Sequence, residues 1–291
     1  MTTLKMTLAV VGTGRAGTAL AKGLREAGWL ITSVATPSLR TARQTVAAIG
    51  GGRAYGILTR LVLEAGTILI CTPDIAIPDV TRRLAEMGGE EWSGKVVLHT
   101  SGAFDRHALD RLEALGAATG SVYPLCILSR KAKPQFHGMP FAVEGDAVAT
   151  RVAGRMARDL GGFVLQLETG ERAAYLAAAT LVRTHVLALV ESAAKILTDL
   201  GLSRRQATKS LSELVQQMLQ MQQRYGAREV WDGVLDDGAL HTTAQEVRAL
   251  RRYPAEYANA YAALQRLAER IAVSRAELNS SSAQRGRRRY N

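Results

Sequence analysis

Short apolar runs alternate with helical patterns over the first half of the chain. Strands are expected at residues 7–11, 29–35, 67–71, 96–99, 120–123, 141–144 and 163–167, most of them rich in β-branched residues and bounded by glycine or proline. Amphipathic helices are expected at residues 16–27 and 41–49, where apolar residues recur every three or four positions. This alternation predicts a parallel sheet with crossover helices.

The second half carries only helical patterns. Residues 171–200 predict a long helix that ends at Gly201, with an apolar stripe made of Tyr175, Ala178, Val182, His185 and Leu189. A capping box at residues 203–206 opens a second helix, another at 243–246 opens a third, and Pro254 opens a last one. The predicted fold class is therefore α/β, an N-terminal Rossmann domain followed by an all-helical C-terminal domain.

The pattern also divides the chain. We expect residues 1–167 to form the Rossmann domain, residues 168–278 the helical domain, and the serine- and arginine-rich residues 279–291 a flexible basic tail. Apolar residues make up 47% of the chain and charged residues 22%, which excludes a disordered protein. The first residues do not resemble a signal peptide, and no run approaches about 18 uncharged apolar residues. With only two cysteines, Cys71 and Cys126, we expect a cytoplasmic protein without a membrane-spanning segment or a structural disulfide.

Charge adds one constraint. Lysine and arginine number 37 against 26 aspartates and glutamates, a net charge of +11, and four arginines fall among the last seven residues. A basic chain favours anionic ligands such as a phosphorylated cofactor, a carboxylate substrate or nucleic acid. Aromatic residues are only 5%, which supplies few platforms for stacking bases, so we do not expect nucleic acid as a partner. No group of histidines, cysteines and acids has the spacing of metal ligands.

Residues 12–17 read Gly-Thr-Gly-Arg-Ala-Gly, a G-x-G-x-x-G loop between a predicted strand and a predicted helix. The first glycine permits a tight turn, the second lets the backbone approach a pyrophosphate, and the third allows close packing of helix on strand. The N–H groups that open the helix also attract phosphate. We predict a dinucleotide site formed by Gly12, Thr13, Gly14, Arg15, Ala16 and Gly17. The alternative is a tight turn in an unoccupied domain.

The end of the second predicted strand indicates which dinucleotide binds. An acid there would favour NAD, but residues 35–40 read Ala-Thr-Pro-Ser-Leu-Arg and contain none. Hydroxyls at Thr36 and Ser38 and the guanidinium of Arg40 suit the 2′-phosphate of NADP, and a solvated basic turn is the alternative. Thr72 and Pro73 follow another strand and are expected beside the cofactor. NADP is therefore predicted, and NAD is the less favoured cofactor.

Several segments together resemble a known family. They are the glycine loop, residues 72–74 (Thr-Pro-Asp), 97–103 (Val-Leu-His-Thr-Ser-Gly-Ala), 120–125 (Gly-Ser-Val-Tyr-Pro-Leu), 136–146 (Phe-His-Gly-Met-Pro-Phe-Ala-Val-Glu-Gly-Asp) and 175–179 (Tyr-Leu-Ala-Ala-Ala). Residues 6 to about 270 thus resemble Rossmann-like oxidoreductases with a C-terminal helical domain of unknown function. These are distant relatives of pyrroline-5-carboxylate reductase and of the 6-phosphogluconate and 3-hydroxyacid dehydrogenases. The resemblance implies a nicotinamide cofactor, a substrate cleft between the domains and a homodimer formed through the helices.

The chain departs from that family in the long helix. The family pattern has a lysine, a histidine and an asparagine where this chain has Arg172, Leu176 and Thr184, and residues 231–238 also differ. The proton relay through lysine and asparagine used by hydroxyacid dehydrogenases is therefore not supported. Either the substrate class differs or the chemistry has been lost.

Four residues are candidates for catalysis: His99, Ser101, Tyr175 and His185. His99 and Ser101 end a strand where parallel sheets bind ligands, but Ser101 could cap a helix and His99 could be structural. Tyr175 and His185 are candidate proton donors, with packing in the core as the alternative for both. The sequence predicts an NADP-dependent oxidoreductase acting on an imine or amine, or a carbonyl or alcohol, of a small carboxylated substrate. A regulatory or scaffold protein that binds NADP without turnover is the alternative.

Overall fold

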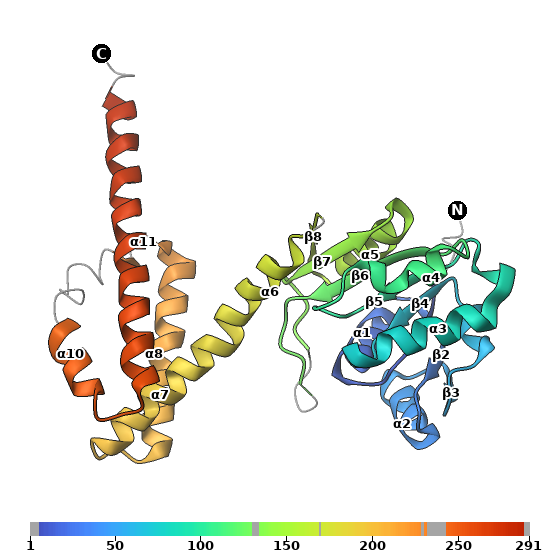
Figure 1. Cartoon of the computed structure of the whole chain (residues 1–291), viewed down its shortest axis with the longest axis horizontal. Coiled ribbons are helices and arrows are strands. Elements are labelled where there is room, and N and C mark those ends of the chain that lie inside the picture. Colours follow the sequence, from blue (N-terminus) through green and yellow to red (C-terminus); the bar gives the residue numbers. More distant parts are fainter. Residues whose placement is uncertain (1–5, 130–133, 169, 228–229, 232–242, 288–291) are drawn as a thin grey trace. The chain divides into compact units, whose positions relative to one another are not determined.

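The computed structural model describes residues 6–129, 134–168, 170–227, 230–231 and 243–287 (Figure 1). It contains two compact units, Met1–Arg183 and Thr184–Asn291. Each is described separately below. The prediction that one domain ends at residue 167 is a statement about which parts of the chain fold independently. It stays a prediction.

The first unit is built on an eight-stranded sheet with the order β3-β2-β1-β4-β5-β6-β7-β8. The strands are β1 (Thr7–Val11), β2 (Leu30–Ala35), β3 (Arg53–Tyr55), β4 (Thr67–Ile70), β5 (Val96–His99), β6 (Ala118–Pro124), β7 (Pro140–Gly145) and β8 (Phe163–Gln166). All neighbouring pairs are parallel except β6 and β7, which are antiparallel. The predicted fold class is confirmed, and the predicted strands are all present. Only the short edge strand β3 was not expected.

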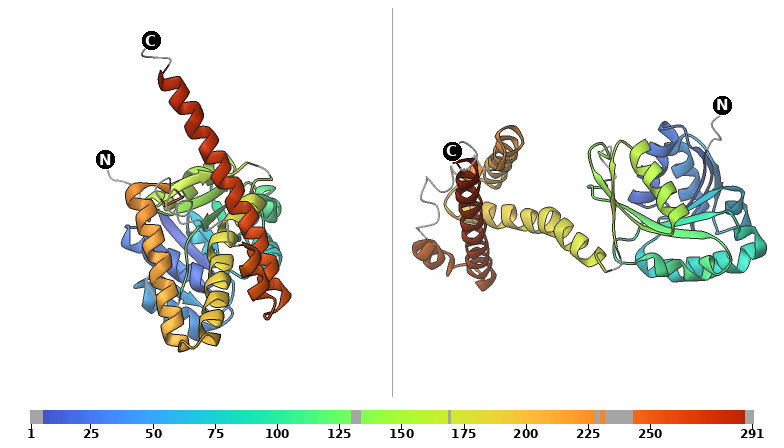
Figure 2. Two further views of the ribbon diagram at one scale, coloured as in Figure 1. Left: turned by 90° about the vertical axis from the view of Figure 1, so that its left-hand side faces the viewer. Right: turned by 90° about the horizontal axis from the view of Figure 1, so that it is seen from above.

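Helices cover both faces of this sheet (Figure 2). They are α1 (Arg15–Glu26), α2 (Leu39–Ile49), α3 (Ile77–Gly88), α4 (Asp110–Glu113) and α5 (Ala147–Asp159). In β1 the side chains of Leu8 and Val10 join a core cluster with α1 and α5, whereas those of Ala9 and Val11 join a cluster with α3 and α4. Both faces of the strand are therefore buried, which is why β1 reads as a continuous apolar run.

One long helix leaves the sheet. Its first part, α6 (Arg172–Thr180), buries Arg172, Tyr175 and Ala179 in the first unit. A π-helical segment, Leu181–His185, follows, and α7 (Val186–Asp199) continues the helix in the second unit. The predicted stripe is therefore wrong beyond Tyr175. Val182, His185 and Leu189 are exposed, because the described chain packs nothing against them.

The second unit is entirely helical over its described residues. Besides α7 it contains α8 (Arg204–Tyr225), α10 (Thr243–Leu250) and α11 (Ala255–Arg287). The predicted capping box opens α8: the Ser203 hydroxyl accepts from the Gln206 N–H at 3.3 Å, and the Gln206 side chain accepts from the Ser203 N–H at 3.1 Å. The backbone of residues 279–287 is helical, where a flexible tail was predicted. These residues contain no proline, so nothing in them forces the helix to end. The last four residues of the predicted tail lie outside the described part.

The helix from Arg172 to Asp199 is long and apolar enough to cross a membrane by length and composition alone. The prediction that no segment could span a membrane is therefore not supported. Core helices of soluble proteins pass the same test. This helix, however, leaves most of its apolar surface uncovered within the chain, including Leu181, Val182 and Leu187.

Candidate functional site

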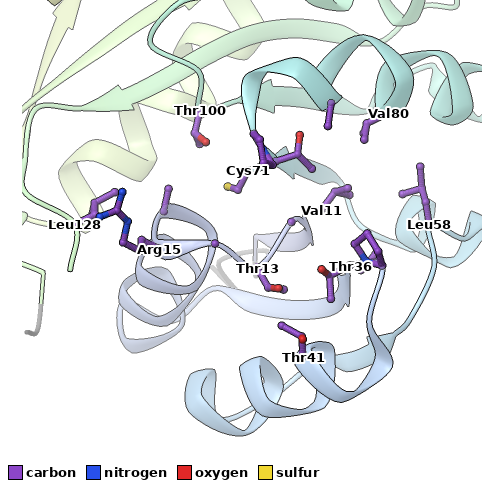
Figure 3. A pocket seen from close by; sticks show the side chains of 18 of the residues that line it. Val11, Thr13, Arg15, Thr36, Thr41, Leu58, Cys71, Val80, Thr100 and Leu128 are labelled. Atoms are coloured by element: carbon purple, nitrogen blue, oxygen red, sulfur yellow. The ribbon is translucent and has the colours of Figure 1, made fainter. Parts of the chain in front are cut away.

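A cavity of about 1000 Å³ opens at the carboxyl ends of β1, β2 and β4 (Figure 3). β1 is the strand at which the chain changes direction across the sheet, with β2 on one side and β4 on the other. Open α/β sheets bind their ligands outside such a switch point, because the loops that follow the two strands diverge there. Every residue that lines the cavity belongs to the first unit. The expected cleft between domains stays a prediction.

The glycine loop forms one end of the cavity. Gly12, Thr13, Gly14, Arg15 and Ala16 all line it. Gly12 has φ +99°, and a Cβ on it would lie 2.7 Å from the carbonyl carbon of Cys71. By contrast, a Cβ on Gly14 would meet only the Cys71 carbonyl oxygen, at 3.9 Å. The first glycine is thus required by the fold, whereas the second leaves open space at the cavity.

The third glycine and the start of α1 complete this end. Gly17 does not line the cavity, but a Cβ on it would lie 2.2 Å from the Gly12 carbonyl oxygen. It therefore allows the helix to pack against the loop, the role predicted for it. No described side chain caps α1, and no acid lies in its first turn. The N–H groups of that turn are available to an anion.

Beyond β2 the site differs from the predicted one. Thr36 and Thr41 line the cavity, but Ser38 and Arg40 do not. The Ser38 hydroxyl caps α2 by accepting from the Thr41 N–H at 3.3 Å, and Arg40 is exposed. On the opposite wall, α3 contributes the half-buried Arg83, which the sequence analysis missed. Only the packing of α3 brings this arginine to the cavity, and no local motif marks it.

Thr72 and Pro73 line the cavity, and their place beside the cofactor stays a prediction. In Figure 3, Thr13, Thr36 and Thr41 lie at one end of the cavity, and Thr100 and Leu128 lie at the other. Threonine hydroxyls along one side suit the sugar and phosphate oxygens of a nucleotide.

His99 is held by the backbone at both ring nitrogens. Its Nε2 lies 2.8 Å from the Asp105 carbonyl oxygen, and its Nδ1 accepts from the Ser101 N–H at 3.2 Å. Burial lowers the pKa of His99 to about 4, so the ring is neutral at physiological pH. His99 does not line the cavity. This arrangement favours the structural alternative.

Ser101 closes the turn that follows β5. Its hydroxyl accepts from the N–H groups of Ala103 and Phe104, both at 3.0 Å. The next helical turn is capped by Asp105 instead, whose carboxylate accepts from the His107 N–H. Ser101 is buried and does not line the cavity, so its hydroxyl shapes the loop.

Tyr175 packs beneath the cavity without lining it. Its ring meets that of Tyr123 edge to face, at 6.1 Å between centroids, and its hydroxyl donates to the Tyr123 carbonyl at 3.4 Å. Burial raises the pKa of Tyr175 to about 12. Tyr123, unlike Tyr175, lines the cavity. His185 is exposed in the π-helical segment and lies in the second unit.

Arg172 occupies a buried polar site where the family pattern has a lysine. Its guanidinium donates to Glu144, to the Ser121 hydroxyl and, at 3.0 Å, to the Ser101 carbonyl. A guanidinium offers five N–H donors in a fixed plane and no acceptor. Its contacts tie α6 to β6, β7 and the turn after β5.

The far wall of the cavity is mainly apolar. Tyr123, Pro124, Cys126, Ile127 and Leu128 form it, and Arg183 also lines the cavity. Burial raises the pKa of the Cys126 thiol to about 11 and that of the Cys71 thiol to about 12, so both stay protonated. Within the described part of the chain, no group of three histidines, cysteines or acids could hold a metal ion.

Comparisons with known proteins match two segments of the chain. Residues 1–124 match the Rossmann-like domain family, and residues 139–268 match a domain of unknown function, DUF2520. No curated protein matches the sequence.

Solved structures share the fold at low identity. A protein from Thermotoga maritima has a TM-score of 0.71 and 20% identity, over 92% of this chain and 99% of that one. A pyrroline carboxylate reductase from Plasmodium falciparum, solved with NADP bound, has a TM-score of 0.60 and 16% identity, over 93% and 96%. An NADH-preferring ketol-acid reductoisomerase from an uncultured archaean has a TM-score of 0.63 and 16% identity, over 96% and 86%.

Proposed function

Because the chain joins a Rossmann-like domain to a DUF2520 domain, we propose that it is an oxidoreductase that uses a nicotinamide cofactor. The observation that carries the proposal is the cavity at the switch point of the sheet, with the glycine loop at one end. At about 1000 Å³ it is at the upper limit of small-molecule sites, which suits a dinucleotide together with a small substrate. The NADP-bound reductase of similar fold supports the same cofactor class.

We propose NADP as the preferred form. No acid stands at the end of β2 to accept a hydrogen bond from the ribose 2′-hydroxyl. Thr36 and Thr41 line the cavity after β2, and Arg83 lines it from α3; hydroxyl and guanidinium donors of this kind suit a 2′-phosphate. The fold itself accepts either cofactor, because one protein of similar structure prefers NADH.

The reaction proposed is the reduction of an imine or a carbonyl, or its reverse, on a small carboxylated substrate. The nicotinamide supplies the hydride when bound, and the chain supplies binding, orientation and exclusion of water. The apolar wall from Tyr123 to Leu128 would exclude water from the reacting atoms. Tyr175 and His185 stay the predicted proton donors. Tyr123 joins them because its ring lies in the cavity wall.

The proposal extends to the assembly. Leu187 on α7 and Leu214, Met218 and Met221 on α8 are all exposed within the chain. Apolar helix surfaces of this kind are usually covered by another protein surface. We propose that they form the interface of a homodimer, with a membrane surface as the contrary outcome.

A thermal-shift experiment with NADPH, NADH or neither tests the cofactor. A ligand at 100 times its dissociation constant stabilises the folded state by about 2.7 kcal/mol, and NADPH should produce the larger shift. No shift with either would contradict the proposal. Turnover is then measured by NADPH oxidation with a panel of cyclic imines and keto acids.

The same assay separates the second candidate, a protein that binds NADP without turnover. Arg172 favours this alternative, because it occupies the place of a lysine in the family pattern and all its contacts are structural. Binding of NADPH without oxidation on any substrate would support it. Turnover would exclude it.

A further inference from the structure

The position of Arg183 on its helix brings it to the cavity. In α6 the buried residues are Arg172, Tyr175 and Ala179, which recur every three or four positions on the side that packs against the sheet. Arg183 follows Ala179 at the same spacing and continues this face. It lines the same cavity as Tyr123, Pro124, Cys126, Ile127 and Leu128. The helix face that is buried at Ala179 therefore reaches the cavity at Arg183.

The backbone at Arg183 is unusual. Residues Leu181–His185 form a π-helical segment in an otherwise α-helical element. A π-turn carries one extra residue and interrupts the regular hydrogen bonds of the helix, and such turns occur frequently at functional sites. The segment therefore points to a role for the side chains that it carries.

Arg183 is exposed, and no described residue supplies it with a counter-ion. Within the described residues it makes no ion pair and no hydrogen bond, in contrast to the buried Arg172. Asp79 is the one acid among the described lining residues, and it is bound to Arg82 at 2.5 Å. An unpaired guanidinium beside an apolar wall binds best to a planar oxyanion, because two parallel N–H groups match the two oxygens of a carboxylate.

Two other cations line the cavity. Arg15 begins α1 directly after the glycine loop, and Arg83 belongs to α3. Both are suited to the phosphates of the dinucleotide. Arg183 is then left for a second anion in the same cavity.

We propose that Arg183 binds a carboxylate group of the substrate, while Pro124, Ile127 and Leu128 hold its apolar body. Arg183 is thereby a specificity-determining residue, and the substrate class is a small organic acid with an apolar frame. This inference rests on the proposed function, because it assigns the glycine-loop end of the cavity to the cofactor.

Direct binding measurements test the assignment without knowledge of the natural substrate. Three carboxylates and their neutral amides serve as probes: L-proline and L-prolinamide, 2-furoate and 2-furamide, benzoate and benzamide. Dissociation constants are measured with and without NADP⁺ on the full chain and on Arg183→Gln and Arg183→Lys. Arg205→Gln, an exposed arginine on α8, is the control.

At least one carboxylate should bind about tenfold more tightly than its amide, the size of one charge-assisted pair. Arg183→Gln should abolish this preference, Arg183→Lys should keep part of it, and the control should keep all of it. The dissociation constant for NADP⁺ should be unchanged in all variants. The proposal is overturned if no carboxylate is preferred, if the preference survives Arg183→Gln, or if that variant loses NADP⁺ instead. Failure of the unmodified chain to bind NADP⁺ would contradict the proposed function. The NADP⁺ measurement detects that failure separately from a failure of the Arg183 assignment.

Discussion

The guanidinium of Arg172 on α6 donates to the carboxylate of Glu144 on β7, at 2.6 Å from Nη2 and 3.1 Å from Nε, with both side chains buried. The same guanidinium also holds the Ser121 hydroxyl and the Ser101 carbonyl. Burial of a charged pair is tolerated only when its hydrogen bonds are met, and here they are. The pair therefore fixes the start of α6 to the sheet.

Loss of either partner should destabilise the protein strongly. Arg172→Met or Glu144→Leu alone should lower the free energy of unfolding by about 3–5 kcal/mol, because each leaves a buried charge unpaired. The double variant should cost clearly less than the sum of the two. Urea unfolding of the four proteins measures this. Additive losses would show that the pair contributes nothing as a pair.

His99 should make stability depend on pH. The folded chain keeps this ring neutral down to about pH 4. Burial lowers its pKa and, together with the charge of Arg172, outweighs the hydrogen bond to the Asp105 carbonyl and the charges of Glu144 and Asp74, which raise it. The unfolded chain takes up the proton at about 6.5, so it binds more protons between these values. The free energy of unfolding should therefore fall as the pH falls from 6.5 to 4, by about 3 kcal/mol.

Comparison with His99→Gln isolates this contribution. The variant should show a flatter slope in that range, because the remaining titrating groups are common to both proteins. Equal slopes would contradict the assignment of a low pKa to His99.

Substitution of the loop glycines should affect folding at two positions and cofactor binding at the third. Gly12→Ala and Gly17→Ala should destabilise the fold, because the added Cβ would lie 2.7 Å and 2.2 Å from backbone atoms. Gly14→Ala should keep the melting temperature within experimental error, since its Cβ has space. The same change should weaken NADPH binding by about tenfold or more, because the backbone approaches the pyrophosphate there. Full NADPH affinity in Gly14→Ala would place the phosphates elsewhere.

Cofactor preference should respond to the arginine that lines the cavity. Arg83→Gln should raise the dissociation constant for NADPH by about tenfold and leave that for NADH nearly unchanged, because only NADPH carries the 2′-phosphate. Arg40→Gln is the matched variant, since Arg40 lies outside the lining. Titration of both cofactors by protein fluorescence measures the constants. A larger effect at Arg40 would restore the assignment made from sequence.

The exposed apolar helices should hold the proposed dimer together. Leu187→Glu should shift the protein from dimer to monomer in analytical ultracentrifugation, because a carboxylate cannot be buried there without a partner. Val148→Glu, an exposed apolar position on α5, is the control and should remain dimeric. A monomeric unmodified protein that sediments with lipid vesicles would instead identify a membrane surface as the cover.

Local sequence patterns were sufficient to predict much of the fold. The alternation of apolar runs predicted the strands, and the glycine spacing predicted a strand, loop and helix at residues 7–26, because these features depend on neighbours in the chain. The same reasoning failed for the stripe beyond Tyr175. Periodicity identifies a helix face but cannot tell whether anything packs against it.

The sequence by itself determined that an α/β part is followed by an all-helical part. It also determined the glycine loop and the alternation of apolar runs that forms the sheet. Only the tertiary structure decided that Arg172 meets Glu144 and Ser121, which lie 28 and 51 positions away. Packing alone likewise brings Arg83 and Arg183 to the cavity and leaves Arg40 outside it. The physical reason is range: hydrogen-bonding and steric rules act over a few residues, whereas a site assembles from loops that the sheet brings together.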